Sequence, residues 1–211
     1  MCARVLNLLL SLAPTAGRPG SDLRTAVNDF IVNAQSLLYS DQAGDPLNEI
    51  FILARQTGMN IQQMARVHDA AAAEAPRTIG ATIVANALIQ FALATESEIV
   101  ANMTFTSRED VELLRSKANI QFSGMEEIAA DDMAQAAYQS IISLHAALSF
   151  YLTQTARPLP RMLSYRFFNS YPSVVLAHRL YADAGRADEL MQENKTIHPA
   201  FMQMSGRALS N

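Results

Sequence analysis

Apolar positions recur every three or four residues through most of the first 156 residues, which predicts a series of amphipathic helices. The first lies within residues 22–39, with Asp22 as a candidate N-cap. A second is expected from Asp45-Pro46 to about Gly58, and a third from an N-cap at Asn60 to a point before Pro76. The inward positions of the first helix are Leu23, Val27, Phe30, Ala34 and Leu37, and those of the third are Ile61, Met64, Ala65 and Ala72.

Residues 77–103 are predicted to form one long helix, and Thr78–Thr95 within it carries no charge. A bilayer-spanning helix needs about 20 predominantly apolar residues. This stretch instead has a polar residue at every fourth position, so a helix buried in a bundle is the favoured interpretation; the polar residues are Thr82, Asn86 and Gln90. The apolar run of residues 5–13 is interrupted by Asn7 and Ser11, which argues against a signal peptide.

Two further helices are predicted before residue 157. Ser107 with Asp110 resembles a capping box and starts a helix that we expect to end near Phe122, because Gly124 follows. The next helix is expected to open with an acidic group and to continue to about residue 155, since acidic side chains suit the positive end of a helix dipole. The acidic group is Glu126, Glu127, Asp131 and Asp132, and the apolar positions behind it are Met133, Ala137, Ile141, Leu144, Leu148 and Leu152.

The pattern changes at Pro158 and Pro160, which stop a helix and stiffen an extended linker. The aromatic-rich segment 162–168 predicts a strand, and residues 206–209 predict a second, closing strand. Two short helices are expected between them, at 173–181 and 187–193, followed by a long loop from Asn194 to Ser205. The predicted fold is therefore mainly α, with a helical bundle in residues 1–156 and a small βααβ module in residues 157–211.

Composition points to a protein whose surface is partly covered by partners. Only 17% of the residues are charged, against roughly 25% in ordinary domains, while 50% are hydrophobic. Residues 1–154 hold 9 Lys and Arg against 16 Asp and Glu, a net charge of −7, and residues 155–211 hold 7 against 4, a net charge of +3. An acidic body argues against DNA wrapping, which relies on neutralising phosphates. The single cysteine, Cys2, excludes an internal disulfide and a Cys-based zinc site.

No motif for catalysis, a metal or a cofactor stands out, so we expect a protein that is not an enzyme. The four histidines form no HExxH and share no metal-ligand spacing, so structural roles are favoured; they are His68, His145, His178 and His198. GxSxG, GxxxxGK[ST] and GxGxxG are absent from the sequence. The acidic group at 126–132 could be the paired carboxylates of a glycosidase, but its spacing fits a solvated helix turn, and the chain has no Trp to stack on a sugar.

The C-terminal segment shares several positions with LysM modules, which also have the βααβ order. The matching residues are Pro172, Ser173, Leu176, Leu180, Tyr181, Asp183, Glu189, Leu190, Asn194, Gly206 and Leu209. The stretch Tyr171–Met202, YPSVVLAHRLYADAGRADELMQENKTIHPAFM, resembles the C-terminal end of the Mu-like phage DNA circularisation proteins, a tail baseplate family. Phe105–Asp110 (FTSRED) and Ala156–Pro160 (ARPLP) resemble the helical middle part of the same family.

The sequence departs from that family at three points. Ala182 stands where the family usually has Gly, and the last turn reads Ser205-Gly206 rather than Pro-Gly. Helices are predicted where the family has an N-terminal β-rich tail domain, so nothing specific to that domain carries over.

The resemblance implies a structural component of a contractile phage tail, an adaptor at the junction of tube and baseplate that acts through protein–protein contacts. The implied partners are other tail proteins (tube, sheath initiator and hub) and copies of itself in a ring, with six copies as our expectation and three as the alternative. The implied location is the virion tail, and the host cytoplasm during assembly. Nucleic acid and membrane are not expected as partners.

Two alternatives remain open. The module could hold peptidoglycan as LysM modules do, in a protein used for cell-wall engagement. The segment Thr78–Thr95 could instead belong to a helical enzyme or a lipid-associated protein.

Candidate partner-binding residues concentrate in the C-terminal module. Arginines 157, 161 and 166 interleave with Tyr165, Phe167 and Phe168, a pattern that could stack single-stranded bases but more often forms a protein interface. Met191, Met202 and Met204 could adapt to an irregular partner surface or fill the core. The predicted partner-binding residues are Arg161, Tyr165, Arg166, Phe168, Arg179, Tyr181, Asn194, His198, Phe201 and Arg207.

Overall fold

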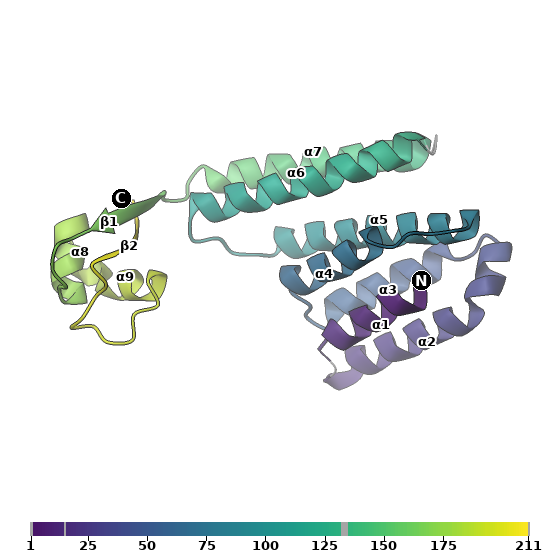
Figure 1. The fold of residues 1–211 in the computed structure, drawn as a ribbon, viewed down its shortest axis with the longest axis horizontal. Helices are drawn as coiled ribbons and strands as arrows, with labels where there is room; N and C mark the ends of the chain where they lie inside the picture. Colours follow the sequence, from purple (N-terminus) through teal and green to yellow (C-terminus); the bar gives the residue numbers. More distant parts are fainter. Residues whose placement is uncertain (1, 15, 132–134, 211) are drawn as a thin grey trace. The chain divides into compact units, whose positions relative to one another are not determined.

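The computed structural model describes residues 2–14, 16–131 and 135–210, and it is mainly helical with a small two-stranded sheet (Figure 1). The mainly α prediction is thereby confirmed. The elements in chain order are α1 (Cys2–Leu12), α2 (Gly17–Tyr39), α3 (Gly44–Gln56), α4 (Ile61–Ala72), α5 (Ile79–Ala101), α6 (Arg108–Asp131), α7 (Gln135–Ala156), β1 (Met162–Arg166), α8 (Ser173–Tyr181), the 3-10 turn η1 (Ala184–Arg186), α9 (Ala187–Glu193) and β2 (Ser205–Leu209).

The chain divides into two compact units, which are described separately. The first comprises residues 1–103 and 118–149, and the second comprises residues 104–117 and 150–211. The helices α6 and α7 contribute to both units, whereas the sequence predicts a division at residue 156.

The first unit is a helical bundle in which α5 packs against α1, α3 and α4. Its largest fully buried side chains come from successive helices; they are Leu6, Leu9, Leu23, Phe30, Leu47, Ile50, Phe51, Met64, Leu88, Phe122 and Met125. The rings of Phe51 and Phe91 stack with centroids 6.0 Å apart. Within the described residues, α5 alone is long and apolar enough to span a membrane, a property that a core helix of a soluble protein shares. Ten residues of α5 are buried, as expected for a helix in the interior of a bundle.

One predicted helix start is confirmed in detail. Asn60 forms a capping box, in which the Gln63 backbone N–H donates to Asn60 Oδ1 and the Asn60 backbone N–H donates to Gln63 Oε1, both over 2.9 Å. By contrast, α2 begins at Gly17, so that Asp22 lies inside it and is not its N-cap. Pro19 does not prevent this, since proline is tolerated in the first turn of a helix.

The prediction that Gly124 ends a helix is wrong, because α6 runs unbroken from Arg108 to Asp131. A glycine costs a helix interior only about 1 kcal/mol relative to alanine. Burial of Phe122, Met125 and Ala129 on either side of Gly124 outweighs that cost.

The prediction that an acidic group opens the following helix is also wrong, since Glu126, Glu127 and Asp131 lie in the last turns of α6. The predicted Asp132 and Met133 lie outside the described residues. A predicted inward position of α4, Ala72, is exposed.

The second unit joins the start of α6 and the end of α7 to the C-terminal segment. The strands β1 and β2 pair antiparallel, from Met162 opposite Leu209 to Arg166 opposite Ser205. The helices α8 and α9 contribute to one hydrophobic cluster with the strands, formed by Tyr165, Leu176, Ala177, Tyr181, Ala187, Leu190, Met202 and Ala208. The backbone N–H of Met162 donates to Glu109 Oε2 (2.6 Å), and that of Arg108 donates to the Pro160 carbonyl (3.0 Å), so the start of α6 is tied to the linker before β1.

Candidate partner-binding surface

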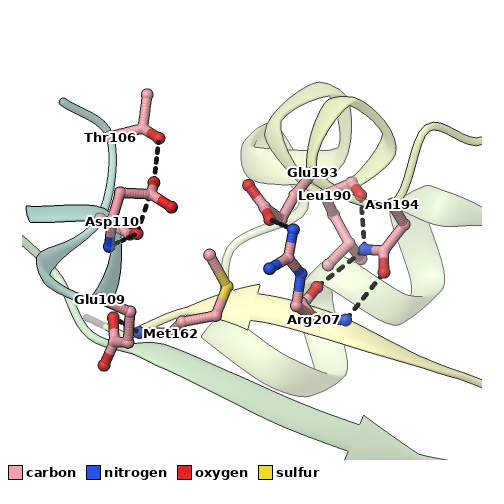
Figure 2. A network of polar contacts seen from close by, with 9 residues as sticks. Thr106, Glu109, Asp110, Met162, Leu190, Glu193, Asn194 and Arg207 are labelled. Carbon is pink, nitrogen blue, oxygen red and sulfur yellow. Dashed lines mark hydrogen bonds and ion pairs between the residues drawn. The ribbon is translucent and has the colours of Figure 1, made fainter. Parts of the chain in front are cut away.

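Asn194 connects the end of α9 to β2 through its side-chain amide (Figure 2). Its Nδ2 donates to the carbonyls of Leu190 (2.8 Å) and Arg207 (2.7 Å), and its Oδ1 accepts the backbone N–H of Arg207 (2.8 Å). A Cβ atom on Gly206 would overlap Asn194 Oδ1 and would lie 2.7 Å from the Tyr165 hydroxyl oxygen. Glycine is therefore required at position 206 by the close approach of these two side chains.

Four of the predicted partner-binding residues take part in the internal structure of the module. The amide of Asn194 forms the contacts just described, and the Arg207 guanidinium pairs with Glu193 at 2.9 Å. Tyr165 and Tyr181 are buried in the hydrophobic cluster. Desolvation by burial raises the pKa of both tyrosines above 10.0, and the carboxylate of Glu189 adds to the effect at Tyr181.

The remaining predicted residues are exposed on the module. Phe168 is fully exposed at 100%, and Phe201 is 72% exposed. The His198 ring lies 5.5 Å from the Phe201 ring, and its Nδ1 accepts the backbone N–H of Ala200. The Arg179 guanidinium lies 4.2 Å from the centre of the Tyr171 ring, a cation–π contact. The other two exposed residues are Arg161 and Arg166, at opposite ends of β1.

Backbone hydrogen bonds bring two segments, 167–173 and 199–204, together beyond the strands. Phe167 N–H donates to the Met204 carbonyl (2.7 Å), and Met202 N–H donates to the Tyr171 carbonyl (3.1 Å). Ser173 N–H donates to the Pro199 carbonyl (2.7 Å). This pairing holds the exposed Phe168 and Phe201 on segments that are about 30 residues apart in sequence but adjacent in space.

Exposed apolar side chains lie on and beside these paired segments, and three of them, Val174, Ile197 and Met204, are absent from the predicted set. We call the group the apolar rim, and it consists of Phe168, Val174, Ile197, Phe201 and Met204, of which Ile197 is 99% exposed. Val174 lies in α8, and Ile197 lies in the loop after α9, where there is no periodicity to interpret. Exposed apolar groups that cluster on one part of a surface are typical of interaction sites.

The histidines of the first unit make structural contacts. His145 Nδ1 lies 2.7 Å from Glu126 Oε1, its Nε2 lies 3.0 Å from Asn119 Oδ1, and its ring stacks on that of Phe122. The buried His68 lies 3.2 Å from the Gln121 amide nitrogen. Among the residues that the structure describes, no group of three or more His, Cys, Asp and Glu side chains could hold a metal ion.

No protein-family model matches the chain, and no curated protein matches it significantly.

Proposed function

We propose that this protein is a structural component of a contractile phage tail baseplate, an adaptor that acts by protein–protein contacts at the junction of tube and baseplate. The observation that carries the proposal is the apolar rim on the C-terminal module, with Phe168, Ile197 and Phe201 largely in solvent. The resemblance of Tyr171–Met202 to baseplate proteins of Mu-like phages supplies the kind of assembly.

The energetics of the rim support an adaptor function. Burying a large apolar side chain contributes about 1.5–3 kcal/mol relative to leaving it exposed. A module of this size has a thin core of its own, so contact with a partner supplies apolar burial that the module lacks alone. Aromatic residues and arginine, which are abundant around the rim, are also enriched in protein interfaces.

The module is proposed to be LysM-like. Its order of β1, α8, η1, α9 and β2, with β1 and β2 paired antiparallel, supports this assignment. Three residues of the resemblance have structural positions that explain their types: Asp183 accepts the Gly185 N–H at the turn, Asn194 holds β2, and Gly206 makes room for Asn194. The partners proposed for the module are tail proteins and further copies of the chain in a ring of six or three.

The proposal is tested by measuring self-assembly of the full chain and its incorporation into tail particles. The variant carrying Phe168→Ser and Phe201→Ser should lose incorporation while keeping its helical content. A matched control carries Val32→Ser and Ile79→Ser, two apolar residues of the first unit that are 81% and 83% exposed. A chain that remains monomeric at every concentration and is missing from intact tails would contradict the proposal.

The alternative function is peptidoglycan binding, which the same βααβ order favours. Pull-down of the full chain with purified cell-wall sacculi distinguishes the two. If both the original chain and the Phe168→Ser and Phe201→Ser variant are retained on sacculi, glycan binding is favoured over the adaptor function. If the original chain is not retained, peptidoglycan binding is excluded.

A further inference from the structure

A small cleft in the second unit lies between the start of α6 and the end of α7, and three arginines surround it. Its volume is about 140 Å³, and its lining includes the guanidinium-bearing side chains of Arg108, Arg115 and Arg157. Two of the apolar side chains that line it, Val111 and Leu152, are buried in the helix pair. The cleft therefore combines an apolar base with an edge of three arginines and one carboxylate, that of Glu112.

Two of the three positive charges at the cleft are not neutralised within the described part of the chain. Arg108 pairs with Glu112, with 2.8 Å between Nε and Oε1. Arg115 Nη1 donates to the hydroxyl of Thr153 over 3.2 Å, a neutral partner that leaves the charge uncompensated. Neither Arg115 nor Arg157 forms an ion pair with any carboxylate that the structure describes, so the cleft has a local charge of about +2.

The size and chemistry of the cleft favour one end group of a side chain over a complete small molecule. Pockets for small molecules usually measure about 300–1,000 Å³, well above the volume here. A guanidinium binds a carboxylate through two parallel hydrogen bonds, and an apolar base suits the methylene groups that carry such a carboxylate.

Nucleic acid fits the cleft less well than a protein carboxylate. Binding of single strands combines backbone contacts with bases stacked on aromatic rings, whereas the described lining of this cleft contains no aromatic side chain. We therefore propose that the cleft binds the carboxylate of an aspartate or glutamate presented by an acidic segment of a partner protein, held by Arg115 and Arg157. This inference rests on the proposed adaptor function and names the chemistry by which the second unit recognises a neighbour.

The test measures binding of a fluorescent peptide of consecutive glutamates to the full chain at low ionic strength, where exposed charges are least screened. A glutamine peptide of equal length and a thymidine oligonucleotide serve as competing probes. Arg157→Gln and Arg115→Gln should each weaken binding of the glutamate peptide by roughly tenfold, since a charge-assisted hydrogen bond of ordinary strength corresponds to about that factor.

The matched control is Arg24→Gln, which removes the same charge from an exposed position on α2. This control should bind the peptide as the original chain does. Because Arg115 also contacts Thr153, Arg115→Lys is included; it keeps the charge and should recover only part of the affinity.

Three results would overturn the inference: equal weakening by Arg24→Gln, no binding of the glutamate peptide, or tighter binding of the oligonucleotide than of the peptide. Failure of the adaptor function is recognised separately. Peptide binding is measured on the purified chain, and the Phe168→Ser and Phe201→Ser variant should retain it even though its incorporation into tails is lost.

Discussion

Replacing Gly206 by alanine is the most informative single change in the C-terminal module. The added Cβ would overlap Asn194 Oδ1 and approach the Tyr165 hydroxyl oxygen to 2.7 Å. Asn194 cannot yield freely, because its amide makes three hydrogen bonds to the backbone of Leu190 and Arg207. We expect the variant to displace Asn194 and release β2 from the end of α9.

The magnitude follows from the contacts that would be lost. Three hydrogen bonds at about 1 kcal/mol each give a loss of roughly 2–4 kcal/mol in the free energy of opening the module. Without the overlap, Gly206→Ala would raise the free energy of opening the module, because alanine is favoured over glycine in a strand interior by about 0.5–1 kcal/mol. The direction of the effect is therefore diagnostic of the close approach at Gly206.

Hydrogen exchange measured by mass spectrometry on peptides within residues 162–209 reports this local stability, independently of the helical bundle. The matched control is Gly124→Ala, since a Cβ there meets nothing within 4 Å in the middle of α6. That change should slow exchange in α6, with a gain of up to about 1 kcal/mol.

A double-mutant cycle with Asn194→Ala separates the overlap from other effects. In the Asn194→Ala background, Gly206→Ala should destabilise the module by less than about 1 kcal/mol, because only the close contact with the Tyr165 hydroxyl remains. Exchange in the Gly206→Ala variant as slow as in the original chain, or the same cost in both backgrounds, would refute the reasoning.

Three further predictions concern other parts of the chain. Asn60→Ala should lower the thermal stability of the chain by about 1 kcal/mol through loss of the capping box, whereas Asn60→Asp should retain most of it; unchanged melting in Asn60→Ala would contradict this. Because the pKa of Tyr165 and of Tyr181 is raised, the folded module holds these protons more tightly than the unfolded chain, so the stability of the module should be retained below pH 10.0 and fall as the pH rises toward the folded pKa values. In the double variant Tyr165→Phe with Tyr181→Phe, hydrogen exchange should show a smaller loss of stability over this pH range, and an equal loss would contradict the burial argument. Burial raises the pKa of the Cys2 thiol to about 11, so Cys2 in the folded chain should be alkylated at pH 8 much more slowly than free cysteine. After denaturation the two alkylation rates should be equal. Equal rates for the folded chain would show that the thiol is not desolvated.

Local patterns in the sequence predict most of the elements because their determinants lie within a few residues. Asn60 with Gln63 closes a capping box over three residues, and α9 begins and ends where its apolar period and the turn before it indicate. The Arg-Pro-Leu-Pro segment before β1 marks the change from long helices to the small sheet. Phe168, Phe201 and His198, which were predicted as partner-binding candidates, are exposed.

Tertiary packing decided the features that local patterns predicted wrongly or not at all. Gly124 remains inside α6 because buried neighbours offset its low helix propensity, and those neighbours contribute only once the bundle has formed. Asn194 and Arg207 meet because β2 returns beside the end of α9, so their internal contacts are invisible in the sequence. Phe168 and Phe201 belong to one apolar rim because hydrogen bonds pair the segments 167–173 and 199–204.

The physical difference between the two groups is the range of the interaction. Helix periods, caps and proline stops depend on the backbone within one or two turns, and the sequence by itself determines them. The cleft between Arg115 and Arg157 and the rim around Phe168 depend on contacts between residues that are 30 or more positions apart, so only the folded chain brings their charges and apolar surfaces together.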